Sequence, residues 1–120
     1  MKKLLFVLLL SISSFVRAEW TPVDFNDIVI AYVDTTTIQS INKNKRAWIR
    51  IEYLKSQTQK SARSLVEFDC LEKKTRFINY ESFNQSNLIE PRNYTNEIQP
   101  WDFYPPGSVF LAILDVVCKK

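Results

Sequence analysis

Two cysteines that follow an apolar N-terminal segment limit this chain more than any other feature of its sequence. Met1–Lys3 is a short positive region, and Leu4–Ser14 (LLFVLLLSISS) is an apolar run. Val16–Ala18 then places small residues at the two positions that a signal peptidase reads. The apolar run is too short to span a bilayer and has the flanks of a signal peptide. We therefore predict a signal peptide over residues 1–18 and one mature domain over residues 19–120.

An exported chain reaches an oxidising compartment, in which Cys70 and Cys118 can form a disulfide. On the chain-entropy model, closing so long a loop stabilises the fold by about 4 kcal/mol. The alternative is a pair of reactive thiols, but the sequence holds no C-x-x-C motif and no histidine to activate one. A structural disulfide is the prediction. Glu19 rather than a cysteine follows the expected cut, so we expect no lipid anchor.

The mature chain is electrically neutral once the expected signal is removed. The full sequence has 16 basic and 13 acidic residues. Lys2, Lys3 and Arg17 leave with the signal, so 16 − 3 = 13 basic residues remain. A neutral chain is not built to hold nucleic acid or an anionic membrane by its overall field. We therefore expect no nucleic-acid partner and, because the apolar segment Val109–Val117 is short, no membrane span.

Catalysis is not expected from this composition. Histidine is absent, which removes Ser-His-Asp and Cys-His machinery and the commonest zinc ligand. Gly107 is the single glycine, which excludes a Gly-rich phosphate loop. Carboxylates at four positions match no metal-binding spacing: Asp34, Glu67, Asp69 and Glu72. We expect Asp34 or Asp69 to cap a turn or to pair with Arg76, and we predict a non-enzymatic protein without cofactor or metal.

The mature chain reads mainly as antiparallel strands. Ile28–Asp34 (IVIAYVD) is β-branched and aromatic, and residues 35–40 are expected to continue extended. Residues 47–54 (AWIRIEYL) alternate, with Ile49, Ile51 and Tyr53 on one face and Trp48, Arg50 and Glu52 on the other. Strands over residues 62–71 and 75–83 are predicted to form a hairpin.

The remaining segments carry weaker signals. Residues 20–26 are expected to be a lead-in that contains Pro22, and residues 84–100 a long loop with one short strand near Leu88 and Ile89. Residues 101–104 (WDFY) are expected to form a short closing strand. No internal repeat or linker indicates a second domain.

Residues 108–118 (SVFLAILDVVC) are ambiguous by period, because three valines and an isoleucine would suit a strand. As a helix, the segment has Ser108 as its N-cap and one apolar stripe: Phe110, Ile113, Leu114, Val117 and Cys118. We favour the helix, packed on the sheet with Cys118 bonded to Cys70 on the covered face. The predicted fold class is α+β, a small antiparallel sheet with a C-terminal helix on one face, tethered by one disulfide.

A spaced set of residues along the mature chain carries a family resemblance. Tyr32-Val33-Asp34 is followed by Ile38, Trp48, Ser64 and the run Phe68-Asp69-Cys70. Further members of the set are Arg76, Tyr80, Trp101, Pro106, Ser108 and Cys118. In this spacing the chain resembles the bacterial surface-adhesin protein E family. The resemblance implies a small antiparallel sheet whose concave face holds a C-terminal helix by the disulfide, and an envelope protein, in some cases dimeric, whose named members bind host matrix or serum proteins.

Two groups of residues are candidates for a binding surface. A basic cluster around Lys43 and Arg46 can contact acidic ligands, although the neutral chain favours a solvated hairpin turn there. Trp101 and Tyr104, which lie beside a Pro-rich break, are the aromatic candidates, whereas Trp48 and Tyr32 are expected in the core. The candidate binding surface is therefore Trp101, Tyr104, Lys43 and Arg46.

Two functions are compatible with these features. The first is a secreted, non-enzymatic envelope protein of a Gram-negative bacterium that binds a protein ligand, such as a host extracellular-matrix or serum protein, and that can form a homodimer. The ligand would meet a sheet edge, the 84–100 loop or the Trp101 region. The second is a soluble periplasmic accessory or inhibitor protein with no adhesive role. The two differ in location, at the cell surface or in the periplasm.

Overall fold

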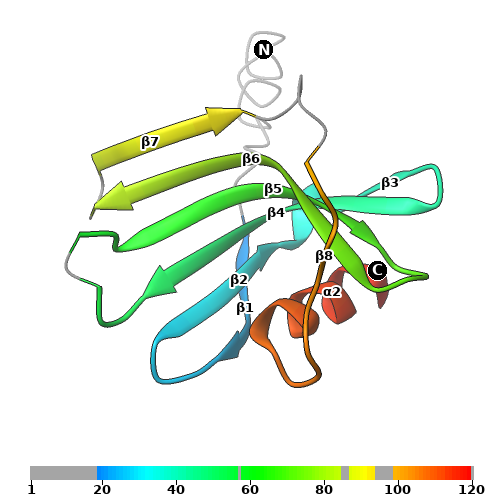
Figure 1. Ribbon diagram of the computed structural model, residues 1–120, viewed down its shortest axis with the longest axis horizontal. Helices are drawn as coiled ribbons and strands as arrows, with labels where there is room; N and C mark the ends of the chain where they lie inside the picture. Colours follow the sequence, from blue (N-terminus) through cyan, green and yellow to red (C-terminus); the bar gives the residue numbers. More distant parts are fainter. Residues whose placement is uncertain (1–18, 57, 85–86, 94–98, 120) are drawn as a thin grey trace, which may run out of the picture.

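The computed structural model describes residues 19–56, 58–84, 87–93 and 99–119, so the predicted signal peptide lies outside the described residues. In these residues, eight strands form one sheet, accompanied by one short 3-10 helix and one α-helix (Figure 1). In chain order the elements are β1 (Trp20–Phe25), β2 (Val29–Asp34), η1 (Thr35–Thr37), β3 (Gln39–Ile41), β4 (Asn44–Tyr53), β5 (Ser61–Asp69), β6 (Lys74–Asn84), β7 (Asn87–Asn93), β8 (Asp102–Phe103) and α2 (Val109–Lys119).

The sheet is antiparallel throughout and runs β1-β2-β4-β5-β6-β7. The predicted β5–β6 hairpin is confirmed, with Asp69 opposite Lys74 and Glu67 opposite Arg76. One edge of β6 is shared, because β7 pairs with its second half and β8 pairs with Lys74 and Thr75 at its start. β3 pairs with the first residues of β4.

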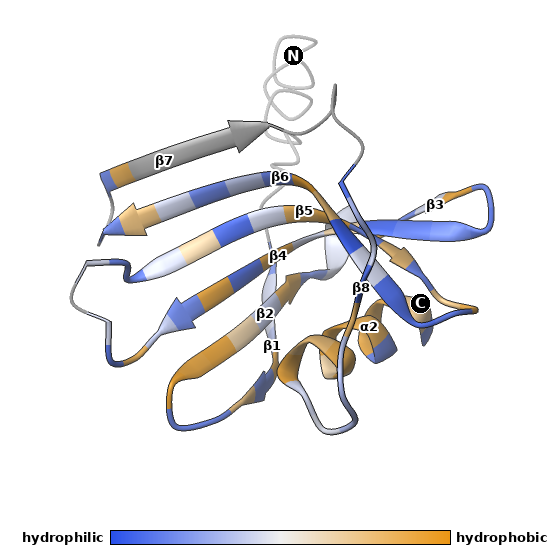
Figure 2. Ribbon diagram, in the orientation of Figure 1, coloured by the Kyte–Doolittle hydropathy of each residue, from blue (hydrophilic) through white to orange (hydrophobic). Residues whose placement is uncertain are grey.

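The core lies between α2 and one face of β2, β4 and β5. Alternate strand residues point to this face because side chains in a strand alternate between the two faces of the sheet. The buried cluster comprises Ala31, Val33, Ala47, Ile49, Ile51, Val66 and Phe68 from the strands and Ile113, Leu114 and Val117 from α2. Hydrophobic positions gather on α2 and on the neighbouring β2 (Figure 2). The predicted α+β fold with a C-terminal helix on one face of the sheet is confirmed.

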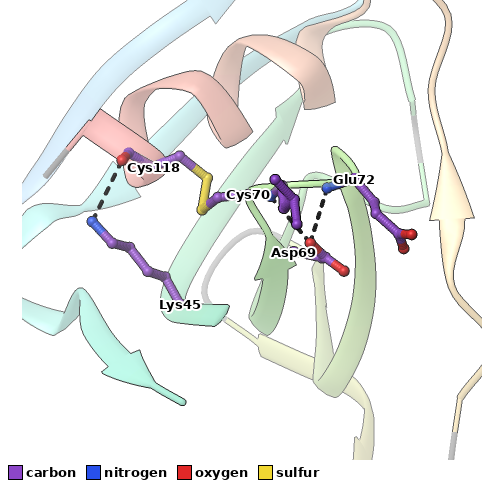
Figure 3. Close-up of a disulfide and its surroundings, with 6 residues drawn as sticks. Lys45, Asp69, Cys70, Glu72 and Cys118 are labelled. Carbon is purple, nitrogen blue, oxygen red and sulfur yellow. Dashed lines mark hydrogen bonds between the residues drawn. A yellow bond between two sulfur atoms is a disulfide. The ribbon is translucent and has the colours of Figure 1, made fainter. Parts of the chain in front are cut away.

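The helix begins and ends as its sequence predicts. The Leu111 amide donates to Ser108 Oγ at 3.2 Å, which is an N-cap contact. At the other end, Cys118 is bonded to Cys70 in the turn after β5, and the Lys45 ammonium donates to the Cys118 carbonyl at 3.5 Å (Figure 3). The predicted disulfide is therefore confirmed, and it fastens the last turn of α2 to the β5–β6 hairpin.

Three weaker expectations are corrected. Residues 20–25 form β1 and are not a lead-in; Pro22 is accommodated because β1 is an edge strand with an irregularity between Pro22 and Asp24. Thr35–Thr37 is a 3-10 turn, because the Asp34 side chain accepts from the Thr36 amide at 3.0 Å and caps it. The short strand expected near Leu88 extends over the whole of β7, within the segment expected to be a loop.

Candidate protein-binding face

The second face of the sheet points away from α2, and in the described chain no helix packs on it. We call it the open face and define it by residues of β4, β5, β6 and β8 and by Trp101, which directly precedes β8 and contacts Lys74 and Arg76: Arg46, Trp48, Arg50, Glu52, Arg63, Leu65, Glu67, Lys74, Arg76, Glu81, Phe83, Trp101 and Phe103. Strand pairing brings them into rows across the sheet. One row joins Arg46 to Glu67 to Arg76, and another joins Arg50 to Arg63 to Glu81.

Glu67 is the buried centre of the first row, with 4% of its surface exposed. Its carboxylate accepts from Arg46 Nη2 at 3.3 Å, from Arg76 Nη2 at 3.2 Å and from Asn44 Nδ2 at 2.8 Å. Burial by itself would raise the pKa of Glu67, but the hydrogen bonds from Asn44, Arg76 and Arg46 and the Arg76 charge outweigh it and lower that pKa. Glu67 is therefore held as an anion that fixes two guanidiniums on the open face.

Arg63 lies between two aromatic rings in the second row. Its Cζ is 5.8 Å from the Trp48 ring centroid and 5.2 Å from that of Phe83. It also forms an ion pair with Glu81. A guanidinium over an aromatic face gains cation–π attraction while its edge stays available to hydrogen-bond partners.

The same pairing of cation and aromatic recurs at Trp101, beside the start of β6. The Trp101 ring centroid lies 4.4 Å from Arg76 Cζ and 5.1 Å from Lys74 Nζ. Lys74 Nζ is also 6.0 Å from the Phe103 ring, and Phe103 is 68% exposed. The open face therefore alternates arginine or lysine with large aromatic rings from β4 to β8.

Two of the four predicted binding residues come together on this face, and two do not. Arg46 and Trp101 are linked through Glu67 and Arg76. Lys43 is exposed in the turn between β3 and β4, at one end of the sheet. Tyr104 lies toward α2, where its ring stacks on Phe110 at 4.8 Å. The structure thus divides these residues between two sides of the sheet, and their role in binding stays a prediction.

Tyr104 belongs to an aromatic row on the covered side. From Phe110 the row continues to Phe77 at 6.3 Å and to Tyr80 at 6.2 Å between ring centroids. Gln59 Nε2 donates to the Tyr80 hydroxyl at 2.6 Å. Burial first, and then the neighbouring Tyr80, raise the pKa of Tyr53 to about 12. This row extends the core beyond α2 and supplies packing at the base of β8.

The carboxylates that sequence reasoning singled out have structural contacts. Asp34 caps η1, and Asp69 Oδ1 accepts from the Leu71 and Glu72 amides at 3.1 and 3.0 Å. Arg76, however, pairs with Glu67 rather than with Asp34 or Asp69. Within residues 19–56, 58–84, 87–93 and 99–119, no group of three His, Cys, Asp or Glu side chains is arranged to hold a metal ion. In the same residues, no helix has both the length and the apolar character that crossing a membrane requires.

Comparison with known proteins adds one finding to this geometry. The model of the surface-adhesin protein E family matches residues 20–119. The chain belongs to this family. The match runs from β1 to the end of α2, so the sheet, the disulfide and the open face all lie within it. Because it belongs to this family, the chain is an adhesin-like surface protein. Neither a curated protein nor a solved structure was found to match the chain.

The open face holds residues that sequence reasoning placed elsewhere. Trp48 of the open face and Tyr32 of β2 were expected in the core, but both are only half-buried, and the Tyr32 hydroxyl donates to Glu52 of the open face at 3.3 Å. The alternation in β4 had already put Trp48 beside Arg50, so the period carried the correct signal and the preference for burying large rings misled. Arg63 was not singled out, and Glu67 was considered only as a possible metal-binding carboxylate, although counting back across the β5–β6 hairpin pairs Glu67 with Arg76.

Proposed function

We propose that this adhesin-like protein is an exported, non-enzymatic protein of the Gram-negative cell envelope that binds a protein ligand through its open face. The observation that carries the proposal is the repeated placement of arginine against Trp48, Phe83 and Trp101 on a face that no helix of the described residues covers. Protein interfaces are enriched in aromatic residues and arginine, and hot spots gather where such anchors are held in place.

The geometry favours this face over the two sheet edges. An unpaired edge can accept a partner strand or a second copy of the chain. Here β1 carries Pro22 and a register irregularity, and β7 carries Pro91, which lacks an amide proton. Both features weaken strand addition. A homodimer through an edge is therefore a secondary proposal, which sedimentation of the purified protein at two concentrations tests.

Membership of the family supports the location and the class of ligand that we propose. We propose a signal peptide at residues 1–18, a mature domain from residue 19, and exposure at the cell surface to host extracellular-matrix or serum proteins. The alternative, a periplasmic accessory or inhibitor protein, uses the same fold without reaching the surface. Because a fold can be shared by proteins with different roles, the location must be measured.

The first test is protease shaving of intact cells that carry a C-terminally tagged copy, with lysed cells as control. Digestion in intact cells supports surface display, and protection until lysis favours the periplasmic alternative.

The second test measures binding of the purified protein to immobilised matrix and serum proteins. Arg63→Ala is expected to weaken binding about tenfold, a loss of about 1.4 kcal/mol that only a minority of interface residues cause on truncation. Lys119→Ala, an exposed change on α2, removes the same charge on the covered side and is the matched control. The proposed role of the open face would be contradicted if the two variants bound equally well. It would also be contradicted if the unaltered protein bound none of the matrix and serum proteins.

A further inference from the structure

We propose that the open face takes an extended acidic–apolar–acidic segment of the partner polypeptide, laid along β4. This inference rests on the proposed function and adds the chemistry of the ligand. Arg46, Trp48 and Arg50 occupy alternate positions on one side of β4. Four residues of extended chain separate the two arginines by about 13 Å. A second extended chain that runs alongside has the same spacing, so its first and fifth residues meet the two guanidiniums and its third residue meets Trp48.

The side chains of Arg46 and Arg50 are more exposed to solvent than the carboxylate side chains with which they pair. The Arg46 side chain is 36% exposed and its partner Glu67 is 6% exposed; for Arg50 and Glu52 the values are 39% and 31%. Glu67 and Glu52 therefore lie deeper than the cations that they hold. A ligand approaching the open face meets positive charge first, although the whole mature chain is neutral.

Each of these two arginines has N–H groups beyond the one in its ion pair. Each contacts its carboxylate through Nη2, Arg46 at 3.3 Å and Arg50 at 3.1 Å, and Arg46 Nε is buried without a hydrogen-bond partner in the described chain. A guanidinium has five N–H donors and accommodates a second carboxylate beside the first. An incoming acidic side chain thus finds a preorganised donor and does not need to displace Glu67 or Glu52.

The surface between Arg46 and Arg50 on β4 is apolar. Trp48 lies opposite Leu65 of β5, and both are half-buried, with Arg63 placed over the Trp48 ring. An apolar side chain of the ligand would cover the exposed parts of Trp48 and Leu65. Excluding water there also strengthens the flanking charge contacts.

An acidic polypeptide suits this row better than a sulfated glycan does. Polyanions are held by clusters of cations whose charge is not neutralised by the protein itself, and their binding scales with the number of such cations. On the open face every arginine already has a carboxylate partner, and apolar rings separate the cations. A polypeptide that alternates acid and apolar residues matches both features.

The test uses a synthetic seven-residue peptide of threonine, with glutamate at its second and sixth positions and leucine at its fourth. One control peptide has the same composition but places the two glutamates next to each other. A second control has glutamine in place of both glutamates. Titration into the isotopically labelled protein, followed by NMR, is expected to shift the amide signals of β4 between Arg46 and Arg50 in a saturable manner. Both controls are expected to bind about fivefold more weakly, since each loses at least one charge-assisted contact at a solvent-exposed site.

Protein variants locate the site. Arg50→Gln is expected to weaken the test peptide about fivefold and to remove most of its preference over the glutamine peptide, whereas Lys119→Gln leaves both unchanged. Trp48→Thr is expected to weaken binding of the test peptide by removing the contact that its leucine makes with the Trp48 ring. If a variant fails to fold, the peptide controls on the unaltered protein still decide.

Each outcome bears on either the inference or the proposed function. Equal binding of the test peptide and its rearranged control would overturn the inference, as would no binding at about 1 mM, a concentration at which even a weak specific site fills. If matrix proteins still bind through Arg63 in that case, the proposed function stands and only the ligand chemistry is wrong. A heparin fragment that binds more tightly than the peptide, and does so independently of Trp48, would also overturn it in favour of a polyanion.

Discussion

The two faces of β4 differ completely although their side chains alternate along one strand. Ile49 and Ile51 lie under α2 and are 1% and 6% exposed, whereas Arg50 between them points the other way into an ion pair with Glu52. The covered face gains its stability from apolar area withdrawn from water. The open face is ordered by charges and rings that remain partly solvated, and exposed ion pairs contribute little to folding free energy. The comparison teaches that stability and binding can be changed separately in this protein.

Removal of the disulfide should have the largest effect on stability, because the disulfide fastens α2 to the sheet. Replacing both Cys70 and Cys118 by serine is expected to lower the free energy of unfolding by about 4 kcal/mol, since a loop of 48 residues regains its freedom in the unfolded chain. Tm should fall by about 20 °C, as measured by calorimetry. An unchanged Tm would mean that apolar packing alone holds α2 on the sheet and that the disulfide adds nothing to the stability of the covered face.

The apolar contact under the helix comes next. Ile113 is fully buried in the core, so Ile113→Ala is expected to cost about 3 kcal/mol through lost burial and the cavity that remains. Asp115→Ala, an exposed change on the same helix, is the control and should cost much less. Denaturant unfolding checks both values. Comparable losses for the two variants would show that α2 does not bury its Ile113 side.

Much of this covered face could be predicted from the sequence. The period of residues 108–118 and Ser108 identify the helix and its buried stripe, and the alternation of residues 47–54 identifies the covered side of β4. These patterns succeed because burial leaves a local periodic signal. The strands at the sheet margins were harder, because β1 and β7 contain proline and are held by pairing with distant residues.

The open face could be predicted only in part. Arg46 and Trp101 were identified as candidates, but they meet only because the β5–β6 hairpin places Glu67 and Arg76 between them. Contacts of this kind depend on register, and a shift of one residue would move each side chain to the other face. Tyr104 follows the last residue of β8 and lies on the covered side, where its ring stacks on Phe110 of α2, a contact that joins residues on two separate elements and leaves no local signal in the sequence.

Glu67 tests whether any residue of the open face also supports folding. Glu67→Gln keeps the size of the side chain but removes the charge that two guanidiniums share, and should cost about 2 kcal/mol at neutral pH. The pKa of Glu67 is below its ordinary value of 4.5 in the folded protein, so its contribution is fully present above pH 4.5 and is lost as pH falls through the folded pKa. Unfolding free energies measured at decreasing pH should therefore converge for the two proteins once the pH has fallen below the folded pKa of Glu67. Parallel curves would mean that Glu67 is not the acid-sensitive group.

Arg63 should give the smallest change in stability and the clearest separation of the two faces. Its ion pair with Glu81 is 45% exposed on the arginine side, so Arg63→Gln is expected to alter the free energy of unfolding by about 0.5 kcal/mol. The same change removes the cation between Trp48 and Phe83 and should weaken binding of a protein ligand severalfold. Thermal unfolding and a binding assay on one preparation measure both quantities. A loss of stability as large as that of Ile113→Ala would show that the two faces of the sheet stabilise the fold together. An unchanged Tm with weakened binding would instead show that the open face serves recognition, because the folding of the domain would then not require Arg63.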